Sequence, residues 1–400
     1  MQPQSLQAAG IVAEYNPFHN GHLYHVQKTK SMTGLPVIAV MSGSFMQRGE
    51  PAFLNKWLRA ELACANGVDL VLELPCAFSL RSAQYFAQGA VRTLEATGCV
   101  ASLACGVETA DRDFAALAER LADSAVQSQI RRLIQNGCGY AAACAQAADG
   151  ISLPNDILAL EYCKALRRSP IKPLWLQRQD QGYNSTEISG NMASASAIRQ
   201  ALLQGDVAWC QAVPSNVGAA LTAARPGCDR QLLWQLLRYR LRLLTPGQIA
   251  ERCQCSEGLE NLLKQAAECS SADEALRRCV NKRYSAGRIR RLLCQLLFDK
   301  PRSLWEQQQP AYLRVLAFND TGRQLLKIMK RTARLPIITK LGRAPAQNRS
   351  DAFAQQLELD LAATDLWSLL QYDGNFNKTG NDFLLSPRYI KNDNGFEVVE

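Results

Sequence analysis

The chain has 400 residues, of which 47% are hydrophobic and 20% charged, and its net charge is +9. This length is natural for two domains that each bury a core, and the composition is that of a globular protein rather than a disordered one. No run approaches the ~18 consecutive apolar residues of a membrane span, and residues 1–9 lack the charged-then-apolar pattern of an export signal. We therefore expect a cytoplasmic protein with no membrane segment.

The first half of the chain alternates short apolar runs with amphipathic segments. We expect strands at Ala9–Glu14, Pro36–Met41, Asp69–Leu74, Ser102–Cys105 and Pro173–Leu176. We expect helices at Gly21–Ser31, Asn55–Asn66, Ser82–Thr97 and within Phe114–Ala148, and further helices that begin near Pro154 and Ser194. Alternation of this kind predicts an α/β fold, with a Rossmann-like parallel sheet covered on both faces, over residues 1–212.

The second half of the chain reads differently. Strand signals fade after about Gly205, and from Arg230 onward leucines recur at helical spacing, as in Ile289–Leu297. This pattern predicts an all-helical domain over residues 213–400. The Asn-, Asp- and Gly-rich segment Asp373–Glu400 reads as a loop-like tail.

Positive charge is concentrated in one part of that second half. Between Arg277 and Arg343 there are 17 Lys or Arg residues and three acidic residues, an excess of 14 that is larger than the net charge of the whole chain. The rest of the protein is therefore slightly acidic. A local basic surplus of this size indicates a polyanionic partner.

The 14 cysteines are scattered singly, and no C-x-x-C pair occurs; the closest spacing is that of Cys253 and Cys255. In a reducing compartment such cysteines act as small buried hydrophobic residues. We predict neither a disulfide framework nor a metal site.

All three histidines lie within seven residues, at His19, His22 and His25. They follow a strand and the turn Asn16-Pro17, and a helix is expected to start at about Asn20. Free backbone N–H groups and the helix dipole make such a start a phosphate-binding site, and a glycine there lets the anion approach the backbone. His19 and His22 can face one ligand and stabilise charge on a phosphoryl group, whereas His25 is expected to be structural.

Two other interpretations of the histidines stay open. Three histidines at this spacing could ligate zinc, although no convincing set of further ligands accompanies them. They could also be ordinary residues of a helix surface.

A second loop–helix junction, Ser194-Ala195-Ser196-Ala197-Ile198-Arg199, fits a complementary role. Its hydroxyls could cap the helix, which is the structural interpretation. Next to a phosphate-binding turn, Ser194, Ser196 and Arg199 are instead expected to clamp a departing pyrophosphate. Arg48, in the loop after the second strand, fits a phosphate or carboxylate contact and a solvated charge equally well.

His19-Asn20-Gly21-His22 resembles the H-x-G-H signature of the nucleotidyltransferase superfamily shared with class I aminoacyl-tRNA synthetases. Further motifs bring the resemblance to the bacterial tRNA(Met) cytidine acetate ligase family: E-Y-N-P-F-H-N-G-H, S-G-S-F-M-Q-R-G-E-P-A, G-V-D-L-V-L-E-L-P, P-N-D-I-L and S-A-S-A-I-R, in that order. It continues at Asn281–Tyr284, Tyr312–Leu316 and Leu335–Ile338. Gln181–Met192 and the tail after Tyr372 carry no motif that we can place.

The resemblance implies a ligase that activates acetate with ATP, forming acetyl-adenylate and pyrophosphate, and transfers the acetyl group to N4 of the wobble cytidine of elongator tRNA(Met). Mg²⁺ is expected to bridge the phosphates without a dedicated metal cage. The catalytic residues would be His19, His22 and Arg199. ATP would contact Ile11, Val12, Ala13, Glu14, Tyr15, Asn16, Pro17, Phe18, His19, Asn20, Gly21, His22, Leu23, Tyr24, Gly106, Asn155 and Arg178.

The basic segment would bind the tRNA, because clustered cations neutralise phosphates and Arg or Tyr side chains stack on unpaired bases. The residues expected there are Lys282, Arg283, Arg288, Arg290, Arg291, Lys327, Lys330 and Arg331. A solvated helix face is the alternative for any single one of these cations.

Two other functions fit parts of the sequence. A small-molecule adenylyltransferase would use the same N-terminal chemistry but would leave the basic region unexplained. A non-enzymatic RNA-binding protein with a regulatory nucleotide site would leave the histidines without a chemical role. The sequence does not indicate an oligomeric state.

Overall fold

The computed structural model describes residues 7–147, 151–178, 188, 190–224, 226–255, 258–343, 351–371 and 378–391. The strands are β1 (Ala8–Ala13), β2 (Val37–Ser42), β3 (Phe45–Met46), β4 (Glu50–Pro51), β5 (Leu70–Leu74), β6 (Val100–Val107), β7 (Lys172–Gln177), β8 (Leu313–Asn319), β9 (Ile337–Ile338) and β10 (Arg388–Ile390).

The helices of the first half are α1 (Asn20–Thr33), α2 (Lys56–Ala65), α3 (Cys76–Ser79), α4 (Ala83–Thr97), α5 (Phe114–Ala122), α6 (Ser124–Gln135), α7 (Tyr140–Ala147), α8 (Pro154–Leu166) and α9 (Ala195–Gln204). Those of the second half are α10 (Ser215–Ala224), α11 (Arg230–Leu243), α12 (Pro246–Arg252), α13 (Leu259–Gln265), α14 (Ala272–Cys279), α15 (Ala286–Leu297), α16 (Arg302–Trp305), α17 (Asp320–Thr332), α18 (Asp351–Leu369) and α19 (Asn381–Leu384).

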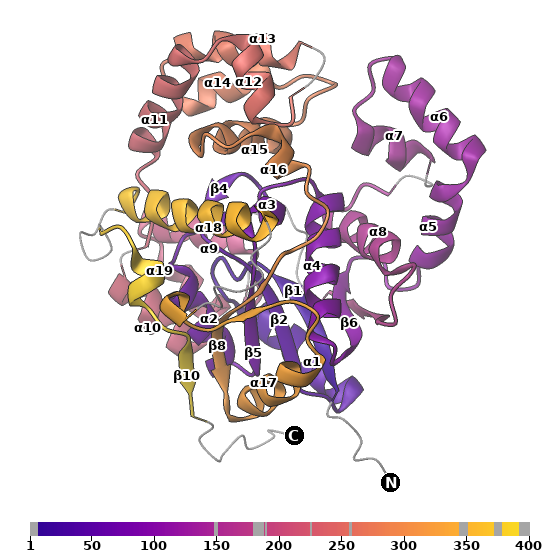
Figure 1. The fold of residues 1–400 in the computed structure, drawn as a ribbon, viewed down its shortest axis with the longest axis vertical. Helices are drawn as coiled ribbons and strands as arrows, with labels where there is room; N and C mark the ends of the chain where they lie inside the picture. Colours follow the sequence, from indigo (N-terminus) through magenta and orange to yellow (C-terminus); the bar gives the residue numbers. More distant parts are fainter. Residues whose placement is uncertain are drawn as a thin grey trace.

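The five expected strands form the parallel centre of one sheet, in the order β5-β2-β1-β6-β7 (Figure 1). The chain starts in the middle of this sheet, builds outward through β2 and β5, and then returns to pair β6 with the free side of β1. The point where the order reverses lies between β1 and β6, and ligands of doubly wound sheets bind outside the carboxyl ends of the strands at such a point. The predicted α/β fold is confirmed.

Side chains of the central strands alternate between two cores, as expected of strands that are buried on both faces. In β2, Val37, Ala39 and Met41 belong to the core that includes Val26 of α1 and Trp57 of α2. The intervening β2 residues join the core that α4 and α8 cover. Continuous apolar strands thus place helices on both faces and leave the carboxyl edge for a site.

The helical half differs from the predicted division at residue 213. Helices α11–α15 do pack around a core of their own, at the top of Figure 1. The chain then returns to the sheet, where β8 pairs antiparallel with β5 and also pairs with β9 and β10. The run Leu313–Asn319 is almost wholly buried, but its partner strand is some 240 residues earlier, and local periodicity carries no information on such pairing.

Two further segments are resolved in more detail than the sequence suggested. Phe114–Ala148, expected to be helical, contains α5, α6 and α7, which form a lobe at the right of Figure 1. The tail expected to be loop-like contains α19 and β10 within residues 378–391, whereas residues 372–377 and 392–400 lie outside the described part. All 14 cysteines are free and most are buried, as predicted.

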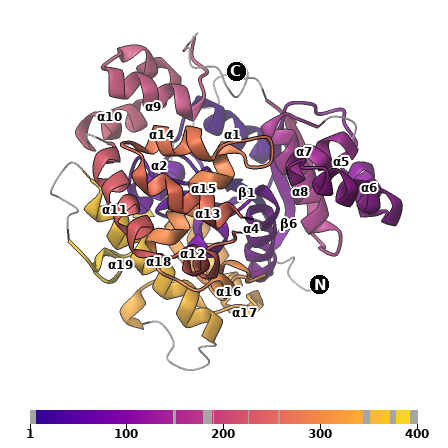
Figure 2. The same ribbon diagram turned by 90° about the horizontal axis from the view of Figure 1, so that it is seen from above.

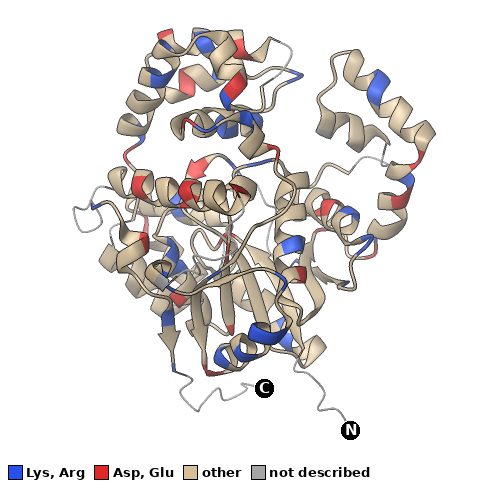
Figure 3. Ribbon diagram, in the orientation of Figure 1, with Lys and Arg blue, Asp and Glu red and all other residues tan. Residues whose placement is uncertain are grey.

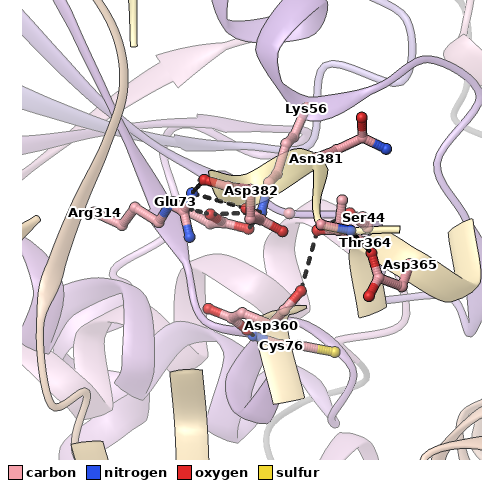
Figure 4. Close-up of polar contacts among 12 residues, drawn as sticks. Ser44, Lys56, Glu73, Cys76, Arg314, Asp360, Thr364, Asp365, Asn381 and Asp382 are labelled. Atoms are coloured by element: carbon pink, nitrogen blue, oxygen red, sulfur yellow. Dashed lines mark hydrogen bonds and ion pairs between the residues drawn. The ribbon is translucent and has the colours of Figure 1, made fainter. Parts of the chain in front are cut away.

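A buried group of charged residues fastens the C-terminal segment to the sheet (Figure 4). We call Lys56, Glu73, Arg314 and Asp382 the ionic cluster. Nζ of Lys56 lies 2.8 Å from Oε1 of Glu73 and 2.8 Å from Oδ1 of Asp382, and Nη2 of Arg314 lies 2.7 Å from the same Oδ1. The four side chains are at most 3% exposed. Two cations and two anions balance, so the buried charges compensate one another.

Candidate functional site

The histidine turn forms as predicted, directly after β1. His19 is the N-cap of α1 in extended backbone geometry, so the helix begins at Asn20. The backbone N–H of Gly21 donates to Nδ1 of His19 at 3.1 Å, and the backbone N–H of His19 donates to Nδ1 of His22 at 3.3 Å. Two imidazoles thus form the capping box that Ser and Glu usually form.

This capping arrangement fixes the tautomers of both rings. Because each Nδ1 accepts a hydrogen bond, the proton of the neutral imidazole is on Nε2. The ring centroids of His19 and His22 are 3.7 Å apart. The two rings therefore lie close enough for their Nε2–H groups to donate to a single phosphoryl group.

The imidazoles of His22 and His25 stay neutral near pH 7. Burial, together with nearby His19 and Arg178, lowers the pKa of His22 well below its usual value. Burial and Arg178 also lower the pKa of His25 to about 4. Neutral rings that donate hydrogen bonds can stabilise charge on a phosphate without transferring a proton to it.

A cavity of about 600 Å³ opens at this turn, at the carboxyl edge of the sheet. It is lined by twelve of the residues predicted to contact ATP: Val12, Ala13, Glu14, Tyr15, Asn16, His19, Gly21, His22, Tyr24, Gly106, Asn155 and Arg178. Ser194, Ser196 and Arg199 line it as well. One cavity therefore brings together the turn, the strand ends and the second junction.

Five residues of the predicted ATP set do not line this cavity: Ile11, Pro17, Phe18, Asn20 and Leu23. Ile11 and Phe18 are core residues. The Asn20 side-chain amide donates to the backbone carbonyl oxygens of Asn191 at 2.8 Å and Gln211 at 2.9 Å. Asn20 thus holds the start of α1 against the segments on either side of α9.

The second junction is a capped helix start that also faces the cavity. Ser194 is the N-cap of α9 and accepts from the Ala197 backbone N–H at 3.1 Å. Arg199 donates to the Asn16 carbonyl at 2.7 Å and to Oε1 of Glu50 at 2.9 Å. The structural interpretation of Ser194 as a helix cap is confirmed, and the hydrogen bond from Arg199 to Asn16 joins this junction to the histidine turn.

The hairpin β3–β4 supplies cavity residues to which the sequence assigned no definite role. Nη1 of Arg48 donates to Oγ of Ser196 at 3.0 Å, and both residues line the cavity. The carboxylate of Glu14 accepts from the Gln47 backbone N–H at 2.7 Å, and burial raises the pKa of Glu14. Arg59 links the ends of β1 and β2 through the carbonyl oxygens of Glu14 and Ser42.

His25 also lines the cavity, although the sequence favoured a structural role for it. Its Nε2 is buried and has no hydrogen-bond partner in the described part of the chain. Its spacing of one helical turn from His22 was the signal that could have placed it there. Asn155, by contrast, has its amide committed to Oε1 of Glu108 at 2.6 Å.

The predicted RNA-binding residues fall into two separate places (Figure 3). Lys282 and Arg283 precede α15, and Arg288, Arg290 and Arg291 lie on it, above the cavity. Lys327, Lys330 and Arg331 lie on α17, which packs near β5 and β8 at the opposite end of the sheet in Figure 1. Of these eight predicted residues, Arg291 lines the cavity and the other seven do not.

The described residues contain no cluster of three or more His, Cys, Asp or Glu side chains arranged to hold a metal ion. The zinc interpretation of the histidines thus gains no further ligand there. Among the helices of the described ranges, none is both long and apolar enough to cross a membrane.

Comparison with known proteins gives a consistent result. The HIGH Nucleotidyl Transferase family matches residues 6–382. The tRNA(Met) cytidine acetate ligase of Acetivibrio thermocellus is 35% identical over 409 residues, which cover 94% of this chain and 98% of the relative. That of Leuconostoc mesenteroides is 37% identical, over 92% of this chain and 96% of the relative.

Solved structures agree with these sequences. The apo crystal structure of Thermotoga maritima TmcAL superposes with a TM-score of 0.90 at 29% identity, over 96% of this chain and all of that one. A second structure of that protein, bound with alpha-thio ATP, gives a TM-score of 0.87 at 28% identity and the same coverage. The chain belongs to the HIGH nucleotidyl transferase family and, within it, to the family of tRNA(Met) cytidine acetate ligases.

Proposed function

We propose that this protein activates acetate with ATP and transfers the acetyl group to N4 of the wobble cytidine of elongator tRNA(Met). The observation that carries the proposal is the paired imidazole turn, whose neutral rings share one cavity with a second helix start. The names of the relatives supply the substrates, and the geometry supplies a site for the chemistry that these substrates require.

In the first step, a carboxylate oxygen of acetate attacks the α-phosphorus of ATP, and the bond to the bridging oxygen of pyrophosphate breaks. The Nε2–H groups of His19 and His22 donate to the oxygens on which negative charge grows, and the dipole of α1 adds to this stabilisation. Since both rings are neutral, they gain interaction with the anion and lose no proton. The product is acetyl-adenylate.

We assign Ser194, Ser196 and Arg199 to the leaving pyrophosphate. Arg199 forms an ion pair with Glu50, and the side chains of Arg199 and Glu50 are 17% and 28% exposed, respectively. Such a partly exposed pair contributes little, about 0.2–1 kcal/mol. A triphosphate in the cavity would therefore compete successfully for the guanidinium.

Mg²⁺ fits this site only as an ion held mainly by the phosphates. Magnesium in nucleotide enzymes keeps several waters and takes one or two protein carboxylates, and Glu14 and Glu50 both line the cavity. When bound, the ion would neutralise charge on the triphosphate.

In the second step, the exocyclic amine of cytidine attacks the acetyl carbon, AMP leaves, and the nitrogen loses a proton. The base must therefore reach a cavity that also contains the adenylate. Basic residues on and before α15 stand above this cavity, as an RNA ligand requires. An aqueous cytoplasmic location follows from these substrates.

The direct test incubates the purified protein with ATP, labelled acetate and total tRNA, followed by nucleoside mapping. We expect label in N4-acetylcytidine of one tRNA species, and acetate-dependent exchange of pyrophosphate into ATP. An adenylylated small molecule without acetylated RNA would favour the adenylyltransferase alternative. RNA binding without either reaction would favour the non-enzymatic one.

A further inference from the structure

Helix α15 contributes to the cavity wall from the helical half of the chain. Ser285, Gly287 and Arg291 line the same cavity as the histidine turn. Ser285 is the N-cap of α15, and its side chain makes no capping hydrogen bond. Figure 2, seen from above, shows α15 over the part of the sheet that holds β1. The cavity wall thus includes a helix start and a guanidinium that lie outside the nucleotide-binding motifs.

The hairpin β3–β4 fixes the position of Arg291. Its Nη1 donates to the backbone carbonyl oxygen of Gln47 at 3.2 Å. Gly49, at φ +79°, lies so close that a Cβ there would sit 2.5 Å from the Arg291 backbone nitrogen. Sγ of Cys294, one turn later, is 3.3 Å from the Gly49 carbonyl oxygen. The guanidinium is therefore held against the cavity by packed backbone and is not a loose surface charge.

Within the described ranges, the charge of Arg291 has no anionic partner. No carboxylate of the described residues lies within ion-pair distance of it, and its one hydrogen bond is to a neutral carbonyl. Burial, followed by the charge of Arg288, lowers its pKa to about 10, so it remains a cation at pH 7. A largely buried cation of this kind is costly unless an anion compensates it. A ligand in the cavity would supply such an anion.

The position of α15 indicates which ligand this is. The histidine turn, α9 and Arg178 already provide donors for ATP on the sheet side of the cavity. Ser285 and Arg291 line the same cavity from the helical half of the chain, and the exposed residue Lys282 lies three residues before Ser285. This segment also meets the α5–α7 lobe, since a Cβ on Gly139 would be 3.2 Å from the Arg283 carbonyl oxygen. An RNA strand that enters along these cations would reach Arg291 last.

We propose that Arg291 and the first turn of α15 form a phosphate subsite that holds the RNA backbone beside the nucleotide entering the cavity. This inference rests on the proposed function, because it assumes an RNA substrate. Arg291 would act as a positioning residue: it fixes the phosphate so that the base projects toward the histidine turn. The subsite would serve the second step of the reaction and not the first.

The test compares two reactions of the full-length protein. Arg291→Ala should lower kcat/KM for tRNA by roughly 10- to 100-fold, the effect of one lost charged hydrogen bond. Acetate-dependent exchange of pyrophosphate into ATP, measured without RNA, should fall by less than about threefold on the same grounds. Arg291→Gln keeps a donor for the Gln47 carbonyl, so it separates loss of charge from loss of packing. Arg242→Ala, an exposed arginine of α11 paired only weakly with Glu268 at 3.9 Å, is the matched control.

A modified substrate identifies the phosphate itself. We would assemble tRNA(Met) with one neutral methylphosphonate linkage at each phosphate flanking the wobble cytidine in turn. One position should reduce kcat/KM of the wild-type protein as much as Arg291→Ala does, and the same linkage should cause no further loss in Arg291→Ala.

Three results would overturn the subsite. Equal loss of exchange and transfer in Arg291→Ala would assign the residue to ATP or to the fold. Full activity of Arg291→Gln would show that the charge is not used. Additive losses at every modified linkage would remove the RNA phosphate as the partner. Absence of both reactions in the wild-type protein would instead reject the proposed function.

Discussion

The ionic cluster and the cavity differ in how their charged side chains are paired. In the ionic cluster, every buried cation has a carboxylate within 3.5 Å, and the set is closed (Figure 4). In the cavity, the guanidinium of Arg291 is bonded, among the residues that the structure describes, only to a backbone carbonyl oxygen, and the imidazoles of His19 and His22 supply donors. The charges of the ionic cluster pair with one another and hold the C-terminal segment against the sheet. Among the described residues of the cavity, Arg199 is paired with Glu50, whereas the charge of Arg291 is left to be matched by a ligand.

The comparison shows how charge balance separates structure from function. Buried charges that are all paired with one another need no ligand, although removing them from water costs desolvation energy. Unpaired buried charges persist only where the rest of the fold holds them in place and where the binding of a ligand offsets their desolvation. The four predictions below test this distinction, beginning with the largest effect.

Removing one charge from the ionic cluster should have the largest effect, a loss of stability. Lys56→Met leaves the carboxylates of Glu73 and Asp382 buried beside one remaining cation. We expect a loss of about 3–5 kcal/mol in the free energy of unfolding, as for other buried pairs that lose one partner. Urea unfolding followed by circular dichroism measures it. Arg302→Met, which breaks an exposed pair with Glu306, should cost at most about 1 kcal/mol; similar losses in the two variants would contradict the comparison.

Removing one hydrogen-bond donor from the cavity should lower the reaction rate and leave the stability of the fold nearly unchanged. His22→Asn takes away one of the two Nε2–H groups, and the acetate-dependent exchange rate should fall by roughly 10²–10³-fold, as for a lost oxyanion donor. Thermal unfolding should shift by only a few degrees. Lys28→Ala, on the exposed side of the same helix, provides the control, and an equal loss of rate there would point to damage of α1 as a whole.

The pH dependence of stability gives a third test. Burial, followed by the charge of Glu73, raises the pKa of Asp360, next to the ionic cluster, from 3.8 to about 7. Between these values the folded protein keeps a proton that the unfolded chain releases. The free energy of unfolding therefore falls by up to about 1.4 kcal/mol per pH unit as the pH rises from 4 to 7.

Asp360→Asn removes this contribution. The stability of the variant relative to the wild-type protein should rise with pH across the same window and become constant above it. Urea titrations in half-unit pH steps measure the difference. Parallel curves for the two proteins would show that Asp360 is ionised throughout.

The smallest effect concerns the ion pair between Glu50 and Arg199 within the cavity. Glu50→Gln frees Arg199 from a carboxylate but leaves its bond to the Asn16 carbonyl. Because a pair of this exposure contributes about 0.2–1 kcal/mol, the KM for ATP in the exchange reaction should decrease by up to about fivefold. An increase in KM would mean that Glu50 itself assists the nucleotide or its cation.

The sequence predicts features formed by neighbouring residues and not features formed by residues that are far apart along the chain. The strand, turn and helix around His19 form from neighbouring residues, and the helix start at Ser194 has its cap within three residues, so both were predicted in place. β8 was not, because a strand that pairs with β5 across the chain has no local signature. The ionic cluster escaped prediction for the same reason: Lys56 reads as an ordinary helix-start lysine until its partners are known.

The helical half shows the same limit at finer scale. The basic stretch before and on α15 was predicted as an RNA surface, and local composition sufficed for that. Which of its cations face solvent and which face a cavity is decided by the packing of α15 on the hairpin at Gly49. The side of the helix on which Arg291 lies could therefore not be read from its neighbours.

One small contact has a wider meaning for the family signature. The second position of H-x-G-H faces away from the cavity here, and Asn20 bridges the carbonyl oxygens of Asn191 and Gln211. The amide thus ties the start of α1 to the segments on either side of α9, and it fixes the histidine turn relative to the junction at Ser194. Variation at this position would change how these segments are held together without altering a residue that lines the cavity.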